Sequence, residues 1–230
     1  MIAALERIKA SPVFIRVIPF GIFLLLTFAQ EWFGQTGQYW LYVAKTVVGA
    51  AMLIWMWPAV EEMRWKWSLA GVVTGVIVFF IWIGIDDCFR LLGINPGFAE
   101  IKIGGKPWNP PAQFGSGSSL AVFLIAVRIV GSSLVVPPLE EVFFRSFLYR
   151  YLVRPEFLTV PFAFFPMPFL ATSIVFGFEH REWLAGVLCG FAYMGLVIWK
   201  KRLGDAITAH TVTNFLLGLW VVSRNEWKFW

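Results

Sequence analysis

The sequence predicts an all-α fold: a polytopic transmembrane bundle of about seven to eight helices, in which a core of four helices carries the functional site. The first observation is composition, since 59% of the 230 residues are hydrophobic and only 14% are charged. An ordinary soluble domain is about 25% charged. The second observation is a series of apolar runs, each close to the ~20 residues that cross a bilayer. This composition excludes a disordered chain and a disulfide scaffold, and it argues against a soluble enzyme.

The expected spans follow one another with mostly short connections. They cover about residues 12–30, 38–58, 67–85, 118–139, 158–178, 183–199 and 205–222. Residues 1–11 are expected to form an interfacial helix. Residues 86–117 are rich in Gly and Pro, which predicts a loop that lies on the membrane with Trp108 as an anchor. This loop divides the chain into N-terminal membrane helices (1–117) and a helical core (118–230) that contains the motifs described below.

The fourth run leaves two topologies open. Its helical pattern continues through Tyr151, past Pro137-Pro138. It is therefore either one long kinked helix or two helices, and two helices would reverse the orientation of everything that follows.

The net charge of +5 comes mainly from basic residues at the ends of apolar runs. At these positions they orient the helices and contact anionic headgroups, so we expect membrane lipids as partners and no nucleic acid. Cys88 and Cys189 are too few for a disulfide framework.

Ionisable side chains inside spanning helices are costly and therefore indicate functional sites. In Glu140-Glu141-Val-Phe-Phe-Arg145, Glu141 precedes Arg145 by four residues, the favourable order for a helical ion pair. Glu140 lies about 100° around the helix from Glu141, which leaves it the freer carboxylate. In an apolar setting such a carboxylate is a stronger base than in water. A structural network in which Arg145 and Arg150 hold both acids fits the spacing equally well.

Two further patterns lie on later hydrophobic helices. Phe176 and His180 share a face at the end of one helix, and His210 and Asn214 share a face of the last helix. The second pair would present hydrogen-bond donors to a cavity. Each pattern alone is also compatible with a structural role, as a histidine near a helix end or as polar contacts between helices.

The spacing of these patterns constrains their depth. The hairpin between the Glu140 helix and the His180 helix should turn near residue 160, so these two side chains are expected to face each other. His210 would lie about two turns deeper, roughly 11–12 Å, unless a helix is tilted or shortened. Two other charges in the expected spans, Lys45 and Arg128, either extend to the interface or line the same cavity.

Glu-Glu-x-x-x-Arg, Phe-x-x-x-His and His-x-x-x-Asn, in this order on successive hydrophobic helices, resemble the CAAX protease and bacteriocin-processing (CPBP) family of type II CAAX prenyl endopeptidase-like intramembrane proteases. The resemblance covers about residues 118–222. It implies a glutamate-dependent endopeptidase with no covalent intermediate, no obligatory metal and no other cofactor. The bacterial CAAX protease-related members are the most similar, which implies a multi-pass protein of the bacterial inner membrane.

The resemblance also assigns roles by motif position. Glu140 would activate water, and His180 would orient that water or share its proton. His210 and Asn214 would donate to the developing oxyanion. The supporting residues would be Glu141, Arg145 and Phe176. The implied substrate is a membrane-associated protein or peptide, lipidated or not, that is cut near its C-terminus.

Three other interpretations remain open. A zinc-dependent membrane protease is one, because a glutamate and two histidines can ligate zinc, although His-Glu-x-x-His is absent from the sequence. A non-catalytic membrane scaffold, chaperone or immunity protein on the same fold is the second. A transporter would also use intramembrane Glu, Arg and His, but the two similar halves expected of it are not seen.

Overall fold

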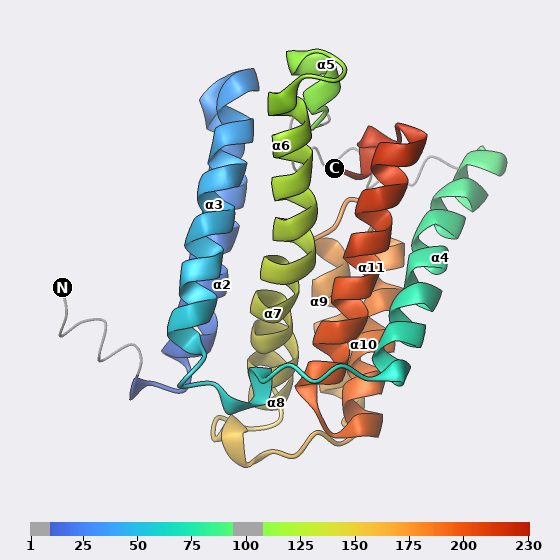
Figure 1. The fold of residues 1–230 in the computed structure, drawn as a ribbon. Helices are drawn as coiled ribbons and strands as arrows, with labels where there is room; N and C mark the ends of the chain where they lie inside the picture. The colour runs from blue at the N-terminus through green and yellow to red at the C-terminus, as the bar shows by residue number, and fades with distance from the viewer. Residues whose placement is uncertain (1–9, 94–107) are drawn as a thin grey trace.

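In a computed structural model that describes residues 10–93 and 108–230, every regular element is a helix (Figure 1). Five helices are long and apolar enough to cross a membrane. They are Gly34–Met56, Leu69–Phe89, Ser119–Tyr151, Trp183–Lys200 and Leu203–Arg224, with shorter apolar helices at Phe14–Ala29 and Pro166–Phe178. The prediction of a polytopic all-α membrane protein is confirmed.

The elements correspond closely to the expected runs. They are α2 (Phe14–Ala29), η1 (Gln30–Phe33), α3 (Gly34–Met56), η2 (Glu61–Met63), α4 (Leu69–Leu91), α5 (Pro110–Phe114), α6 (Ser119–Val130), η3 (Gly131–Val135), α7 (Val136–Glu141), η4 (Val142–Leu148), α8 (Tyr149–Tyr151), η5 (Phe157–Thr159), α9 (Pro166–Phe178), α10 (Trp183–Lys200), α11 (Leu203–Arg224) and η6 (Trp227–Phe229). The expected interfacial helix lies almost entirely outside the described residues, as does much of the expected 86–117 loop.

Three expectations need correction. The run expected at 158–178 becomes α-helical only at Pro166. The expected loop begins later, because α4 continues to Leu91, and it contains the short helix α5. Trp108 is not a membrane anchor: only 3% of it is exposed, and its ring packs against Tyr39 and Tyr42 with centroids 4.9 and 5.5 Å away.

The fourth run is one continuous helix from α6 to α8, so Pro137-Pro138 does not divide it. Proline lacks an N–H and collides with the carbonyl four residues before it. Here the prolines lie between two π-helical segments, η3 and η4, whose wider turns change the hydrogen-bond register. Glu140 and Glu141 end α7, the short α-helical piece between these segments.

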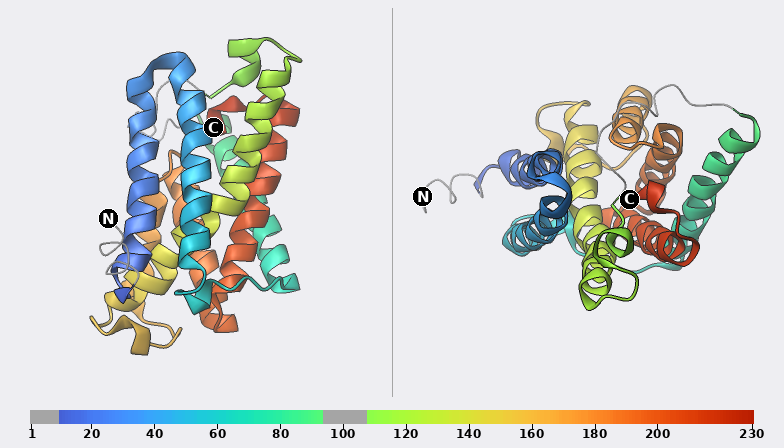
Figure 2. Two further views of the ribbon diagram at one scale, coloured as in Figure 1. Left: turned by 60° about the vertical axis from the view of Figure 1, so that its left-hand side comes forward. Right: turned by 90° about the horizontal axis from the view of Figure 1, so that it is seen from above.

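We call the continuous helix Ser119–Tyr151 the long helix. The long helix and α11 lie in the middle of the bundle when it is viewed from one end, with α2 and α3 on one side and α4 on the other (Figure 2). α4 packs against α11 at Gly75, where a Cβ would collide with the Ala209 carbonyl oxygen. The expected core of four consists of the long helix, α9, α10 and α11. The division of the chain into 1–117 and 118–230 stays a prediction, and helices from both parts pack against each other.

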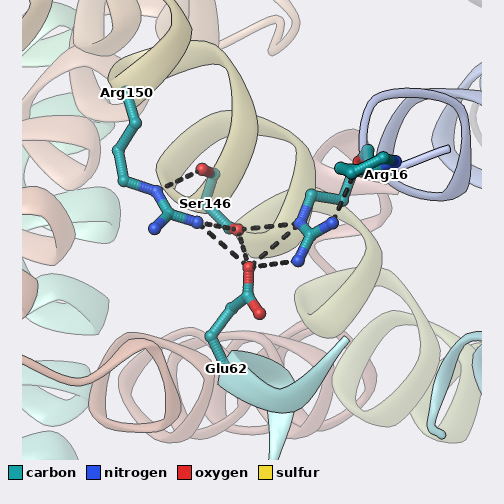
Figure 3. Close-up of polar contacts among 5 residues, drawn as sticks. Arg16, Glu62, Ser146 and Arg150 are labelled. Atoms are coloured by element: carbon teal, nitrogen blue, oxygen red, sulfur yellow. Dashed lines mark hydrogen bonds and ion pairs between the residues drawn. The ribbon is translucent and has the colours of Figure 1, made fainter. Parts of the chain in front are cut away.

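A buried charged cluster joins α2, η2 and the end of the long helix (Figure 3). Glu62 Oε1 accepts hydrogen bonds from Arg16 Nε and Nη2 (3.0 and 2.7 Å), from Arg150 Nη2 (3.0 Å) and from the Ser146 hydroxyl. Arg150 Nε also donates to the Ser146 carbonyl oxygen at 2.6 Å. We call Arg16, Glu62, Ser146 and Arg150 the Glu62 cluster. Arg150 is thus the partner of Glu62, an interaction that the sequence patterns did not predict.

Candidate functional site

A cavity of about 500 Å³ lies among the α2–α3 turn, α6, the α9–α10 connection and α11. Its lining includes the polar residues Gln30, Gln35 and Gln38. Aromatic rings form much of its wall. Of the predicted site residues, four line it: Phe176, His180, His210 and Asn214. The structure therefore brings the second and third motifs to one cavity, although His180 and His210 come from different helical hairpins.

Glu141 is the centre of a fully buried polar group. Its Oε1 is 3.0 Å from His210 Nδ1 and 3.2 Å from Arg145 Nη1. Because a carboxylate only accepts, Nδ1 of His210 carries the proton of this hydrogen bond. The guanidinium of Arg145 also lies over the Phe176 ring, 4.1 Å from its centroid. The i,i+4 ion pair expected from the sequence is present, and it extends to His210.

Glu140 has the freer carboxylate of the pair. Its Oε2 is buried and makes no hydrogen bond within the described part of the chain. The Nε2 atom of His210 lies 3.9 Å from this Oε2. About 12% of the Glu140 side chain stays accessible. Glu140 is not itself among the residues that line the cavity, so its link to the cavity runs through His210.

His180 occupies the connection after α9. Its Nδ1 is 2.9 Å from the Phe176 carbonyl oxygen. A carbonyl oxygen only accepts, so Nδ1 carries the proton and Nε2 of the neutral ring keeps its lone pair. The Trp82 and Phe176 rings hold the imidazole, with centroids 5.3 and 4.9 Å away.

The expected direct meeting of Glu140 and His180 is not observed. No hydrogen bond or ion pair joins them among the described contacts, and His210 is the histidine beside Glu140. The expectation assumed a regular hairpin, whereas α9 begins only at Pro166 and has 13 residues. This shortening also removes most of the expected depth difference, because both histidines now contact the ring of Phe176.

Asn214 uses one amide hydrogen to bind the protein itself. Its Nδ2 donates to the Ser132 carbonyl oxygen at 2.8 Å, which ties α11 to η3. An amide nitrogen has two hydrogens, so one donor remains.

Sequence reasoning missed two neighbours of the site. Tyr193 stacks on His210, with centroids 5.1 Å apart and rings inclined by 24°, and Glu179 lines the cavity. Tyr193 stands alone in an apolar helix, so no spacing pattern marked it. Glu179 directly precedes His180, so its acidity was the only available signal.

Metal binding was one of the open interpretations. Within residues 10–93 and 108–230, no three or more His, Cys, Asp or Glu side chains are grouped as a metal ion requires. Chelation tests this interpretation directly.

Residues 121–216 match the family model for Type II CAAX prenyl endopeptidase Rce1-like proteins. All three motifs lie inside the matched segment, so the resemblance drawn from them is confirmed. Separate comparisons with curated proteins and with solved structures found no match.

Proposed function

We propose that the chain is an intramembrane endopeptidase, because residues 121–216 match the family model for Rce1-like type II CAAX prenyl endopeptidases. Its substrate is a membrane-associated protein, lipidated or not, that is cut near its C-terminus. The observation that carries the proposal is the environment of Glu140. Its buried Oε2 has no hydrogen-bond partner within the described residues and lies 3.9 Å from Nε2 of His210, which lines the same cavity as His180 and Asn214.

The chemistry needs a base for water. Glu140 removes a proton from water, and the hydroxide adds to the carbonyl carbon of the substrate. The proton is then delivered to the nitrogen that leaves, so that one water is added across the bond. His180 orients the water through Nε2, since its Nδ1 is held by Phe176. Exclusion of bulk water makes the carboxylate a stronger base than it is in solution.

The oxyanion requires donors that are already in place. Asn214 offers its second amide hydrogen, because the first is bound by Ser132. His210 already donates from Nδ1 to Glu141, so it can donate from Nε2 only as the imidazolium. Donors of this kind typically contribute ~10²–10³ in rate.

The chain is an integral multi-pass membrane protein, with five helices of spanning length in the described residues. We further propose that the membrane is the inner membrane of a bacterium, which rests on the resemblance to bacterial family members alone.

Cleavage of an internally quenched peptide in detergent tests the proposal. Glu140→Gln should lower the rate by about 10⁴-fold, at the upper end of what general-base catalysis contributes. Glu61→Gln is the matched control, because Glu61 is an exposed acid far from the site, with 82% of its side chain accessible. Activity that survives Glu140→Gln unchanged would contradict the assignment.

Two further results would favour the other interpretations. Loss of cleavage on chelation, restored by added zinc, would support a zinc protease. A folded wild-type protein that cleaves none of a broad set of membrane-associated peptides would support the non-catalytic scaffold.

A further inference from the structure

A second carboxyl group lines the cavity, and the proposed hydrolysis gives it no role. Glu179 lies in the connection after α9, directly before His180, and it is among the residues that line the cavity. Its Oε2 is buried and makes no hydrogen bond within the described residues. A buried polar atom without a partner is rare and requires an explanation. Beside a cavity, a bound substrate can supply the missing partner.

The connection that carries Glu179 is held in place by close packing of the helices on either side. A Cβ on Gly186 of α10 would lie only 2.9 Å from the Cα of Gly177 in α9, so a larger residue would push the two helices apart. His180, the next residue, is fixed by the hydrogen bond between its Nδ1 and the Phe176 carbonyl oxygen. The backbone therefore presents Glu179 to the cavity in a defined position.

Glu179 also lies close to the proposed base. Among the charges of the described residues that act on Glu140, that of Glu179 acts most strongly, ahead of the adjacent Glu141. The charge of Arg145 acts on both Glu140 and Glu179. Coulombic interactions weaken with distance, so the two carboxyl groups lie near each other and near the same guanidinium.

Two carboxyl groups this close, away from bulk water, share one proton instead of both ionising. Burial raises the pKa of Glu179 to about 8, although the charge of Arg145 opposes this rise. Two cations, Arg145 and Lys45, act on Glu140, whereas the cation that acts on Glu179 is Arg145. The negative charge therefore belongs on Glu140 and the shared proton on Glu179, which suits one as a base and the other as an acid.

We propose that Glu179 is the general acid of the hydrolysis and gives its proton to the nitrogen of the peptide bond that is cut. This inference rests on the proposed function and names the proton donor that the proposed function leaves open. An amine does not leave as its anion, so the nitrogen must gain a proton as the bond breaks. An acid whose pKa lies near the working pH is the most effective donor for such a step.

Every proton and electron pair has a place in this step. Glu140 takes one proton from water, and the resulting hydroxide bonds to the carbonyl carbon, whose π electrons move to the oxygen. When those electrons return, the C–N bond breaks, its electron pair stays on the nitrogen, and the proton of Glu179 bonds to that nitrogen. Glu140 is then protonated and Glu179 is ionised, and the transfer of one proton from Glu140 to Glu179 restores both. The sum is the addition of one water across the bond.

Glu140 acting alone is the rival proton donor. It would have to carry the proton from the attacking water to the nitrogen, whereas Glu179 already holds a proton beside the cavity. The rival mechanism also leaves the buried, unbonded Oε2 of Glu179 without a purpose.

Hydrolysis of a peptide and of its thioester analogue tests the proposal. The probe is an internally quenched, membrane-associated peptide that the wild type cleaves, made also with a thioester in place of the cut bond, and added to the full chain in detergent. A thiolate leaves without gaining a proton, since a thiol has a pKa of about 8.5. Glu179→Gln should therefore lower peptide cleavage by about 10²–10⁴-fold, the contribution of a positioned general acid, and thioester hydrolysis by less than about 10-fold.

Glu182→Gln is the matched control. Glu182 is a second acid in the same connection that also lines the cavity, and the charges of Arg181 and Lys228 act on it. Its loss should leave both rates nearly unchanged. The thioester rate also reports on folding, because a structural fault in Glu179→Gln would slow both substrates alike.

The outcomes separate this inference from the proposed function. Glu140→Gln should slow both substrates, because each of them needs activated water. If Glu179→Gln slows both substrates equally, or slows neither, Glu179 is not the proton donor and Glu140 remains the base. If Glu140→Gln leaves peptide cleavage unchanged, or if the wild type cleaves no peptide of a broad set, the proposed function is wrong and this inference is wrong with it.

Discussion

Two buried charged groups on the same long helix differ in how completely their atoms are bonded. In the Glu62 cluster, no buried side-chain atom lacks a partner within the described residues. In the group around Glu140 and Glu141, both Oε2 atoms and both terminal nitrogens of Arg145 make no hydrogen bond there. Arg145 and Ser146 are neighbours in sequence, yet they belong to opposite groups.

This difference indicates different purposes. Buried polar groups are normally paired, and complete networks rigidify a structure. The Glu62 cluster closes one end of the bundle by joining three segments, so we infer that it stabilises the fold. The incomplete group lies beside the cavity, where a substrate and water can supply the missing bonds. Variants of the two groups should therefore separate stability from activity.

The largest effect is expected for Arg145→Ala. Its removal leaves Glu141 buried without a cation, and breaking such a pair typically costs about 3–5 kcal/mol. The melting temperature in detergent and the cleavage rate should both fall. Arg145→Lys, which keeps the charge, should recover part of both. An Arg145→Ala protein as stable as the wild type would refute the role of this ion pair.

Glu62→Ala should be nearly as damaging to stability but should not act on the chemistry. It leaves Arg16 and Arg150 facing each other, and we expect a loss of about 3 kcal/mol, because Glu62 is 18% exposed. Glu61→Ala, in the same short helix, removes only an exposed ion pair and should change stability by less than about 0.5 kcal/mol. If the two variants lower the free energy of unfolding equally in denaturant titrations, the Glu62 cluster stabilises the fold no more than an exposed ion pair does.

Asn214→Ala should act mainly on turnover. Loss of an oxyanion donor should lower kcat by about 10²-fold, which is less than the effect of Glu140→Gln. Loss of its bond to Ser132 should cost about 1 kcal/mol of stability. In steady-state kinetics we expect kcat to fall while KM stays nearly unchanged. An unchanged kcat would exclude Asn214 from the oxyanion site.

The smallest effect is expected for the dependence of stability on acidic pH, through Glu62. Burial alone would raise the pKa of Glu62, but the attraction of Arg16 and the hydrogen bond from Ser146 outweigh it and lower that pKa. A carboxylate with a lowered pKa stabilises the fold above its unfolded pKa of about 4.3 and loses that contribution as the pH falls further. The stability difference between wild type and Glu62→Gln should therefore shrink below about pH 4. A difference independent of pH would show that ionised Glu62 does not stabilise the fold.

The sequence predicted most of the fold because the bilayer imposes length and hydropathy on each span. It also predicted the Glu141–Arg145 pair, since i,i+4 spacing determines which side chains meet on one helix. Contacts between segments that are distant in the sequence were harder to predict. The meeting of Arg16 with Glu62 depends on how α2 and η2 pack, and no local pattern encodes it.

The histidines show the same limit. The family resemblance implied that both histidines serve one site, but their spacing placed His210 about two turns deeper, and it did not predict the partner of Glu140. A hairpin of regular length would have placed His180 opposite Glu140, whereas the late start of α9 at Pro166 leaves His210 in that place. The sequence left open whether Lys45 and Arg128 extend to the interface or line the cavity, and only the packing places both on the ring of Tyr42 beside the cavity.

The most direct test is to measure the cleavage rate and the melting temperature of Glu140→Gln and Glu62→Gln together. The account predicts that Glu140→Gln melts within a few degrees of the wild type and cleaves nothing, while Glu62→Gln melts lower and, at temperatures where it is folded, cleaves at close to the wild-type rate. If Glu140→Gln retains cleavage, or if its loss of activity merely follows loss of the folded state, the incompletely bonded acid is not the base of a protease.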